Sequence, residues 1–147
     1  MGLLAAMYGM LLVVAQFTCI IALVLGGGWS LPGTAWAVLG LGALVLVWAG
    51  LSLGPGNLTV MPAPRTSSTL IVHGIYRFIR HPMYTAVLLC GSALAFGAPS
   101  VVRWVALAAC TVVLVLKIRH EEALLAARHQ DYPERMRGVK RLLPLIW

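Results

Sequence analysis

The stretch GIYRFIRHPMY, residues 74–84, places two arginines, a histidine and two tyrosines in a very apolar chain. Hydrophobic residues make up 61% of the 147 residues and charged residues only 10%, and the mean hydropathy is +0.92. This composition is far too apolar for a soluble domain of this length. Because polar side chains are costly to hold beside membrane-length apolar segments, this cluster is interpreted as functional.

Apolar runs on both sides of the stretch predict four transmembrane helices. The runs cover residues 3–25, 34–53, 83–98 and 101–116. The first two have the length of about 20 residues that a helix needs to cross the hydrocarbon core, and the third is shorter. Gly97 and Pro99 supply the tight turn before the fourth. The first run lacks the basic start of a signal peptide, which favours a retained helix. The predicted fold is an all-α polytopic membrane protein with a C-terminal helical tail.

The basic residues predict the orientation of these helices. If the helices alternate in direction, ten of the eleven basic residues share one side, and only Arg103 lies on the other. The positive-inside rule then places the crowded side, with both termini, in the cytoplasm. Short loops of low charge and the absence of eukaryotic sorting tails fit a prokaryotic inner membrane. The bilayer is the expected partner; nucleic acid is not, because the basic residues do not form a soluble module.

The chain is predicted to be a single membrane domain, residues 1–147, in two parts. Residues 1–53 form an apolar helical hairpin whose strongly polar member is Gln16. An interhelical hydrogen bond is the favoured interpretation of Gln16, with a ligand contact as the alternative. Residues 54–147 carry the polar motifs. The three cysteines all lie in apolar runs, and their spacing predicts neither a disulfide framework nor a metal site.

Prolines define the path of the second part. Two prolines within residues 61–64 restrict the residues before them, which predicts an extended connector along the cytoplasmic surface. Pro82 suits the first turn of a helix. Arg80 and His81 are therefore expected at a helix N-terminus, where free backbone amides favour an anionic group such as a carboxylate.

Two adjacent acidic residues, Glu121 and Glu122, follow the last apolar run. We expect that helix to leave the membrane near Lys117 and continue to about Arg128. The carboxylates either accept hydrogen bonds from a ligand or form a solvated helix end paired with Lys117 or Arg128. Neighbours on a helix point about 100° apart, so both are not expected to face one pocket equally. Glu122 is expected to be the solvated or surface-paired one.

The motif residues each have a second interpretation. His81 is a core histidine, a general base or a ligand contact. Tyr76 and Tyr84 are ligand contacts or aromatic anchors at the membrane interface. Taken together, the residues form a longer pattern. It comprises Gly74, Tyr76, Arg80, His81, Pro82 and Tyr84, then Glu121, Glu122, Leu125, Tyr132, Val139, Leu143 and Pro144.

Over residues 54–144 this pattern resembles the isoprenylcysteine carboxyl methyltransferase and phospholipid methyltransferase group of integral membrane enzymes. The resemblance implies S-adenosylmethionine-dependent methyl transfer at the cytosolic membrane face. The acceptor would be lipophilic: a prenylcysteine carboxylate, a lipidated substrate, or a lipid amine or thiol. The implied cofactor contacts are Ser68, Thr69, Leu70, Ile71, Tyr76, Arg80, His81, Pro82, Met83, Tyr84 and Glu121. No metal is implied.

The resemblance also implies catalytic residues on the last long helix, namely Glu121, Lys117 and Arg119. The family places an arginine about one turn before the glutamate, and here that position is Lys117, with Arg119 two residues later. Lysine does not reproduce the planar fork with which arginine binds carboxylates. A Rossmann glycine fingerprint is absent from the sequence, so a conventional soluble methyltransferase is not expected.

Two other classes remain as alternatives. One is a small non-enzymatic membrane protein that binds lipid or a partner. The other is a membrane reductase of sterol-like substrates with a related C-terminal fold, which the small number of helices disfavours. The identity of the methyl acceptor stays open.

Overall fold

The computed structural model describes residues 3–54 and 71–142. In these ranges the elements are α1 (Leu3–Leu25), α2 (Gly33–Leu53), η1 (Gly74–Arg77), α3 (Pro82–Gly97), α4 (Val101–Arg128) and α5 (Tyr132–Arg135). The described part contains no β-strand, only an isolated parallel bridge between Ile79 and Lys140. The all-α prediction is confirmed. The extended connector predicted around residues 61–64 lies outside the described residues.

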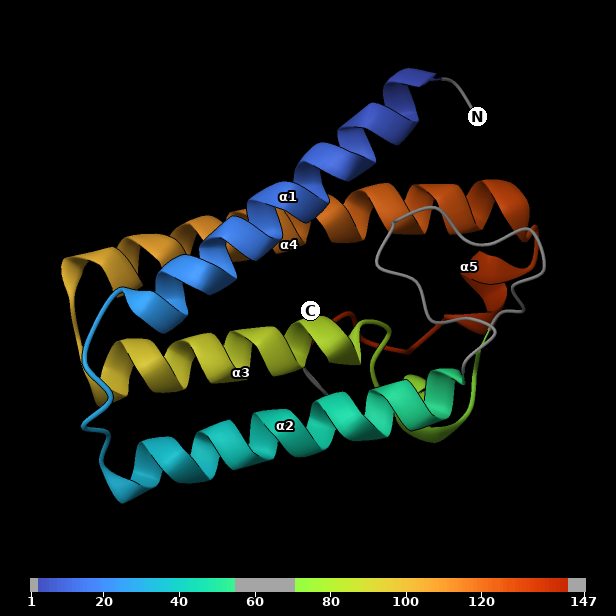
Figure 1. Cartoon of the computed structure of the whole chain (residues 1–147). Helices are drawn as coiled ribbons and strands as arrows, with labels where there is room; N and C mark the ends of the chain where they lie inside the picture. Colours follow the sequence, from blue (N-terminus) through green and yellow to red (C-terminus); the bar gives the residue numbers. More distant parts are fainter. Residues whose placement is uncertain (1–2, 55–70, 143–147) are drawn as a thin grey trace.

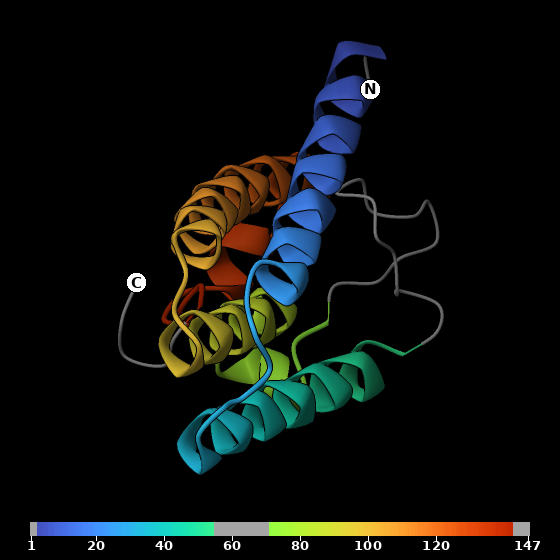
Figure 2. The same ribbon diagram turned by 60° about the vertical axis from the view of Figure 1, so that its left-hand side comes forward.

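The four long helices pack in two pairs: α2 and α3 lie side by side, and α1 crosses α4 obliquely (Figure 1). α3 lies between α2 and α4 and also contacts α1. A view turned by 60° shows α1 and α2 leading away from their shared loop in different directions (Figure 2). α1 and α2 are therefore joined by one loop but pack mainly against different helices.

Three of the described helices, α1, α2 and α4, are long and apolar enough to cross a membrane. α3 has 16 residues, about 24 Å at 1.5 Å per residue, which is shorter than a hydrocarbon core of about 30 Å. Large apolar side chains on the outside of the bundle are open to the surroundings, for example Leu4 (82% exposed) and Leu51 (78%). Such a surface is suited to lipid, and the chain is an integral membrane protein.

Small residues allow α2 and α3 to approach closely. A Cβ atom added to Gly42 of α2 would lie 2.5 Å from Cys90 Sγ and 3.3 Å from the Ala86 carbonyl oxygen of α3. Close backbone approach through small residues is the usual way in which membrane helices associate. Cys19, Cys90 and Cys110 are free thiols.

Arg103 closes one end of the bundle, here called the far end, which carries the loops 26–32 and 98–100. Its side chain is fully buried and donates hydrogen bonds to five backbone carbonyls, those of Leu23, Gly27, Gly28, Leu94 and Ala98. Several of these carbonyls belong to the C-terminal ends of α1 and α3, where the helix dipole attracts a cation. This explains why, among the described residues, a single arginine lies at the end of the bundle away from the other basic residues. The other end of the bundle is called the site end.

Candidate active site

The motif at residues 74–84 is held on the site end by α2. Gly74 has φ of +59° and lies against Ser52, so a side chain at this position would collide with the serine. The Ile75 amide donates to Ser52 Oγ at 3.4 Å. Ile75 and Ile79 pack on Ala49 of α2. The turn that leads into α3 is thereby fixed before any polar side chain is placed.

α3 begins at Pro82, as predicted, with His81 as its N-cap residue. The His81 carbonyl accepts from the amides of Tyr84 (3.0 Å) and Thr85 (3.1 Å). Pro82 itself is fully buried. His81 therefore projects from the helix start toward α4.

A C-terminal segment, residues 136–142, covers this helix start and is called the strap. The amides of Arg80 and His81 donate to the strap carbonyls of Lys140 (2.8 Å) and Arg141 (2.9 Å). Arg80 adds bonds from Nε to the Val139 carbonyl and from Nη2 to the Met136 carbonyl, both 2.8 Å. The arginine expected to bind the cofactor carboxylate thus joins the motif to the tail.

Glu122 completes this attachment. Its Oε1 lies 3.2 Å from Arg80 Nη1, and its Oε2 accepts from Arg141 Nε and Nη2, both at 2.9 Å. The side chain is only 11% exposed. Glu122 is paired and not solvated, and the partners in these contacts are Arg80 and Arg141 rather than the expected Lys117 or Arg128. The hydrogen bond to Glu122 also raises the pKa of Arg141.

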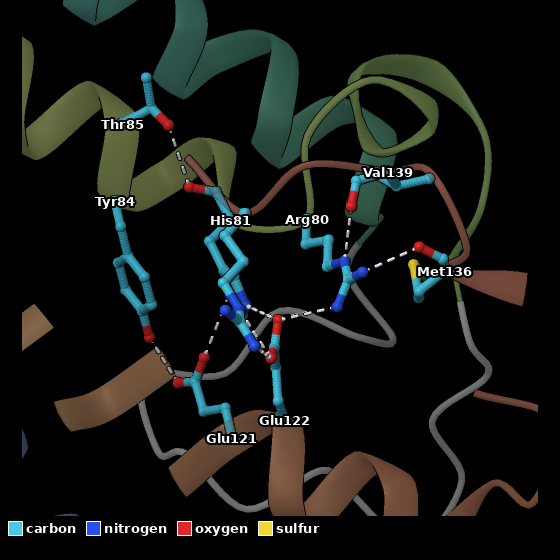
Figure 3. A network of polar contacts seen from close by, with 9 residues as sticks. Arg80, His81, Tyr84, Thr85, Glu121, Glu122, Met136 and Val139 are labelled. Carbon is cyan, nitrogen blue, oxygen red and sulfur yellow. Dashed lines mark hydrogen bonds and ion pairs between the residues drawn. The ribbon is translucent and has the colours of Figure 1, made fainter. Parts of the chain in front are cut away.

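Glu121 faces the other side of the same histidine (Figure 3). Its Oε1 accepts a hydrogen bond from the Tyr84 hydroxyl, and its Oε2 lies 3.6 Å from His81 Nδ1. The His81 and Tyr84 rings are stacked, with centroids 5.5 Å apart and planes 8° apart. The two carboxylates point in different directions from the helix, but the imidazole stands between them. Both therefore border His81.

His81 faces a carboxylate with each of its two ring nitrogens. Its Nε2 is buried and lies 3.4 Å from Glu122 Oε1, within ion-pair distance. Tyr76 borders the same region. Burial, with the nearby charge of Glu121, raises the pKa of Tyr76 to about 12.

The two other predicted catalytic residues have different surroundings. Lys117 is 3% exposed and donates from Nζ to Gln16 Oε1 of α1 at 2.7 Å. Its Nζ also lies 5.1 Å from the centre of the Tyr84 ring. Arg119 is exposed, since two residues along a helix turn the side chain by about 200°. The structure brings Lys117 to Tyr84 but does not bring Arg119 to the cluster.

Some of the remaining predicted cofactor contacts lie within the described residues and others lie outside them. Met83 packs beside the Ala49 cluster. Ile71 is described and half-buried, whereas Ser68, Thr69 and Leu70 lie outside the described residues. The interhelical hydrogen bond predicted for Gln16 is confirmed. Sequence reasoning missed Arg141 and the pairing of the strap with Arg80 and Glu122, because contacts between positions about 20 to 60 residues apart leave no local periodic signal.

These features define an integral membrane protein with a polar, carboxylate-containing site at one end of an apolar helical bundle. The family model of phospholipid methyltransferase matches residues 32–131, more than half of the chain. The chain belongs to the phospholipid methyltransferase family, as its motifs predict. The match runs from the start of α2 to the residue before α5, so α1 and the strap lie outside it. No curated protein matches the chain.

Proposed function

We propose that the protein is an S-adenosylmethionine-dependent methyltransferase that acts on a lipophilic acceptor at the membrane–cytosol boundary. The observation that carries the proposal is the cluster of Glu121, Tyr84 and His81 in a chain of this family. Family membership favours this function over a lipid-binding protein or a reductase. The acceptor class is a prenylcysteine carboxylate, a lipid amine or a lipid thiol.

The residues of the cluster fit the chemistry of the proposed cofactor. When bound, S-adenosylmethionine supplies a methyl group activated by a positively charged sulfonium. A carboxylate such as Glu121 and aromatic rings such as Tyr76 and Tyr84 attract cations of this kind. The buried His81 imidazole, which lies beside both Glu121 and Glu122, offers one further polar contact. Arg80 is committed to the strap and Glu122, so we assign it to holding the site together.

Methyl transfer needs positioning more than covalent help from the protein, because it is an in-line displacement. The Glu121 carboxylate is held by the Tyr84 hydroxyl, and the stacked His81 ring limits the movement of both. With a pKa of about 12, the Tyr76 phenol stays protonated at neutral pH and acts as a neutral ring and hydrogen-bond donor. The strap covers the start of α3 and limits the access of water from that side.

The proposal includes four membrane crossings with the site end in the cytosol. α3 ends at the far end, near aromatic side chains typical of a membrane interface. There Trp29 lies 6.4 Å from Trp36, and Phe96 lies 4.7 Å from Trp104. The exposed loop residue Ser30, changed to cysteine, should react with an impermeant thiol reagent only from outside the cell. Labelling only from the cytosolic side would refute this orientation.

The function is tested with detergent-purified protein, a labelled methyl donor and a panel of lipid extracts. We expect label to enter a lipid fraction with the native chain. Glu121→Gln should lose most of this transfer. The matched variant Glu134→Gln, on exposed Glu134 of α5, should keep it. A native chain that neither binds the donor nor transfers label would refute the proposal.

A further inference from the structure

A buried polar pair links α1 to the candidate site. Gln16 is 8% exposed and Lys117 is 3% exposed, and the Lys117 ammonium donates to Gln16 Oε1 at 2.7 Å. α1 lies outside residues 32–131, which the family model matches. A residue from the unmatched helix thus contacts a lysine one turn before the glutamate pair.

The direction of the lysine is unusual. Gln16 is nine residues from the far end of α1 at Leu25, about 14 Å, whereas Lys117 is 16 residues from the start of α4 at Val101, about 24 Å. The ammonium therefore extends back toward the middle of the bundle. Lysines near the ends of apolar helices usually extend toward water. Here the side chain follows the tilt of the Cα–Cβ bond toward the N-terminus of its helix and finds Gln16.

This position brings the ammonium to the site. Lys117 Nζ lies 5.1 Å from the Tyr84 ring centre, and the Tyr84 hydroxyl donates to Glu121. A cation near the face of an aromatic ring attracts that face, more strongly where water is excluded. Gln16 contacts Lys117, Lys117 contacts the Tyr84 ring, and Tyr84 contacts Glu121, so the four residues form a continuous series.

We infer that Gln16 is a positioning residue: it holds Lys117 against the Tyr84 ring and so fixes the Glu121 carboxylate for the ligand. The inference rests on the proposed function. The competing explanation is that the pair only joins α1 to α4. The two explanations predict different ligand affinities for a chain in which both partners are apolar. Replacing a whole buried polar pair is often tolerated by the fold, but it removes the ammonium from the Tyr84 ring.

The test compares Gln16→Leu, Gln16→Glu, Lys117→Met and the double variant Gln16→Leu/Lys117→Met. Thr18→Val is the matched control, because Thr18 is exposed and its hydroxyl bonds only to Val14 of its own helix among the described contacts. Thermal unfolding and the affinity for S-adenosylhomocysteine are measured in one detergent. Gln16→Leu should weaken binding about 3- to 10-fold, the range of a positioning contact. Gln16→Glu keeps an acceptor oxygen and should recover most of this loss.

The double variant decides between the explanations. We expect it to unfold close to the native temperature while it still binds weakly. Native stability together with native affinity would overturn the inference and leave Gln16 as a helix contact.

A second measurement is independent of the proposed function. The chain has two lysines, buried Lys117 and exposed Lys140, so amine acylation followed by mass spectrometry has an internal standard. Lys117 should react more slowly than Lys140 in the native chain, and faster in Gln16→Leu but not in Thr18→Val. If the native chain binds no S-adenosylhomocysteine, the proposed function fails while this result still tests the positioning. Equal Lys117 reactivity in all variants would overturn it.

Discussion

Replacing Glu122 by glutamine should loosen the strap from the helix start. Glu122 accepts from Arg141 through two nitrogens and lies 3.2 Å from Arg80. A hydrogen bond to a charged group contributes about 1.5–3 kcal/mol. Arg141 is 36% exposed and Arg80 21%, and solvent screens part of this energy. Glutamine keeps one acceptor oxygen, so we expect a net loss of about 2 kcal/mol, or a roughly 30-fold larger opened population.

Limited trypsin digestion measures this population, because the strap contains Arg137, Lys140 and Arg141 as cleavage sites. When opening is fast, the cleavage rate follows the opened fraction. Cleavage in the strap should therefore be about 30-fold faster in Glu122→Gln. Glu134→Gln, the same change at an exposed position, is the control. Equal cleavage rates in the two variants would refute the assignment of Glu122 as the anchor of the strap.

Three further changes test other parts of the structure. Arg103→Leu leaves five carbonyls without their donor and should lower the free energy of unfolding by about 3 kcal/mol or more. Native stability in a thermal assay would contradict this role of Arg103. Gly42→Leu should separate α2 from α3 and lower the unfolding temperature, whereas Gly40→Leu, with open space around it, should not; equal effects would contradict the packing. Because folding raises the pKa of Tyr76 to about 12, its contribution to stability is complete below about pH 10, the unfolded value, and is lost as the pH rises to 12. Tyr76→Phe should show a smaller loss of stability over that range, and an unchanged loss would argue against a buried phenol.

Helices and their boundaries follow largely from local patterns in this sequence. The apolar runs predict α1, α2 and the first part of α4, and Pro82 correctly marks the start of α3. The pairing of these helices does not follow from local patterns. α1 packs on α4 and α2 on α3, and this depends on small contacts such as Gly42 against Cys90. A run of apolar residues does not record which of its faces meets another helix.

The candidate site was predictable in its residue types but not in its pairings. The motif and the glutamate pair indicate a ligand site, and the structure brings Glu121, Tyr84 and His81 together. Glu122 and Arg80 pair with each other and with residues of the strap, and these pairings could not be read from spacing. The same holds for Gln16 and Lys117, which are separated by 101 positions.

The central claim is that Glu121 belongs to a site for the methyl donor. Its most direct test is calorimetry of S-adenosylhomocysteine binding to the native chain, Glu121→Gln and Glu134→Gln in one detergent. Loss of one charged hydrogen-bonding partner should weaken binding by about 1.5–3 kcal/mol, roughly 10- to 150-fold, in Glu121→Gln alone. Equal affinity in Glu121→Gln and the native chain, or no binding to the native chain, would contradict the account.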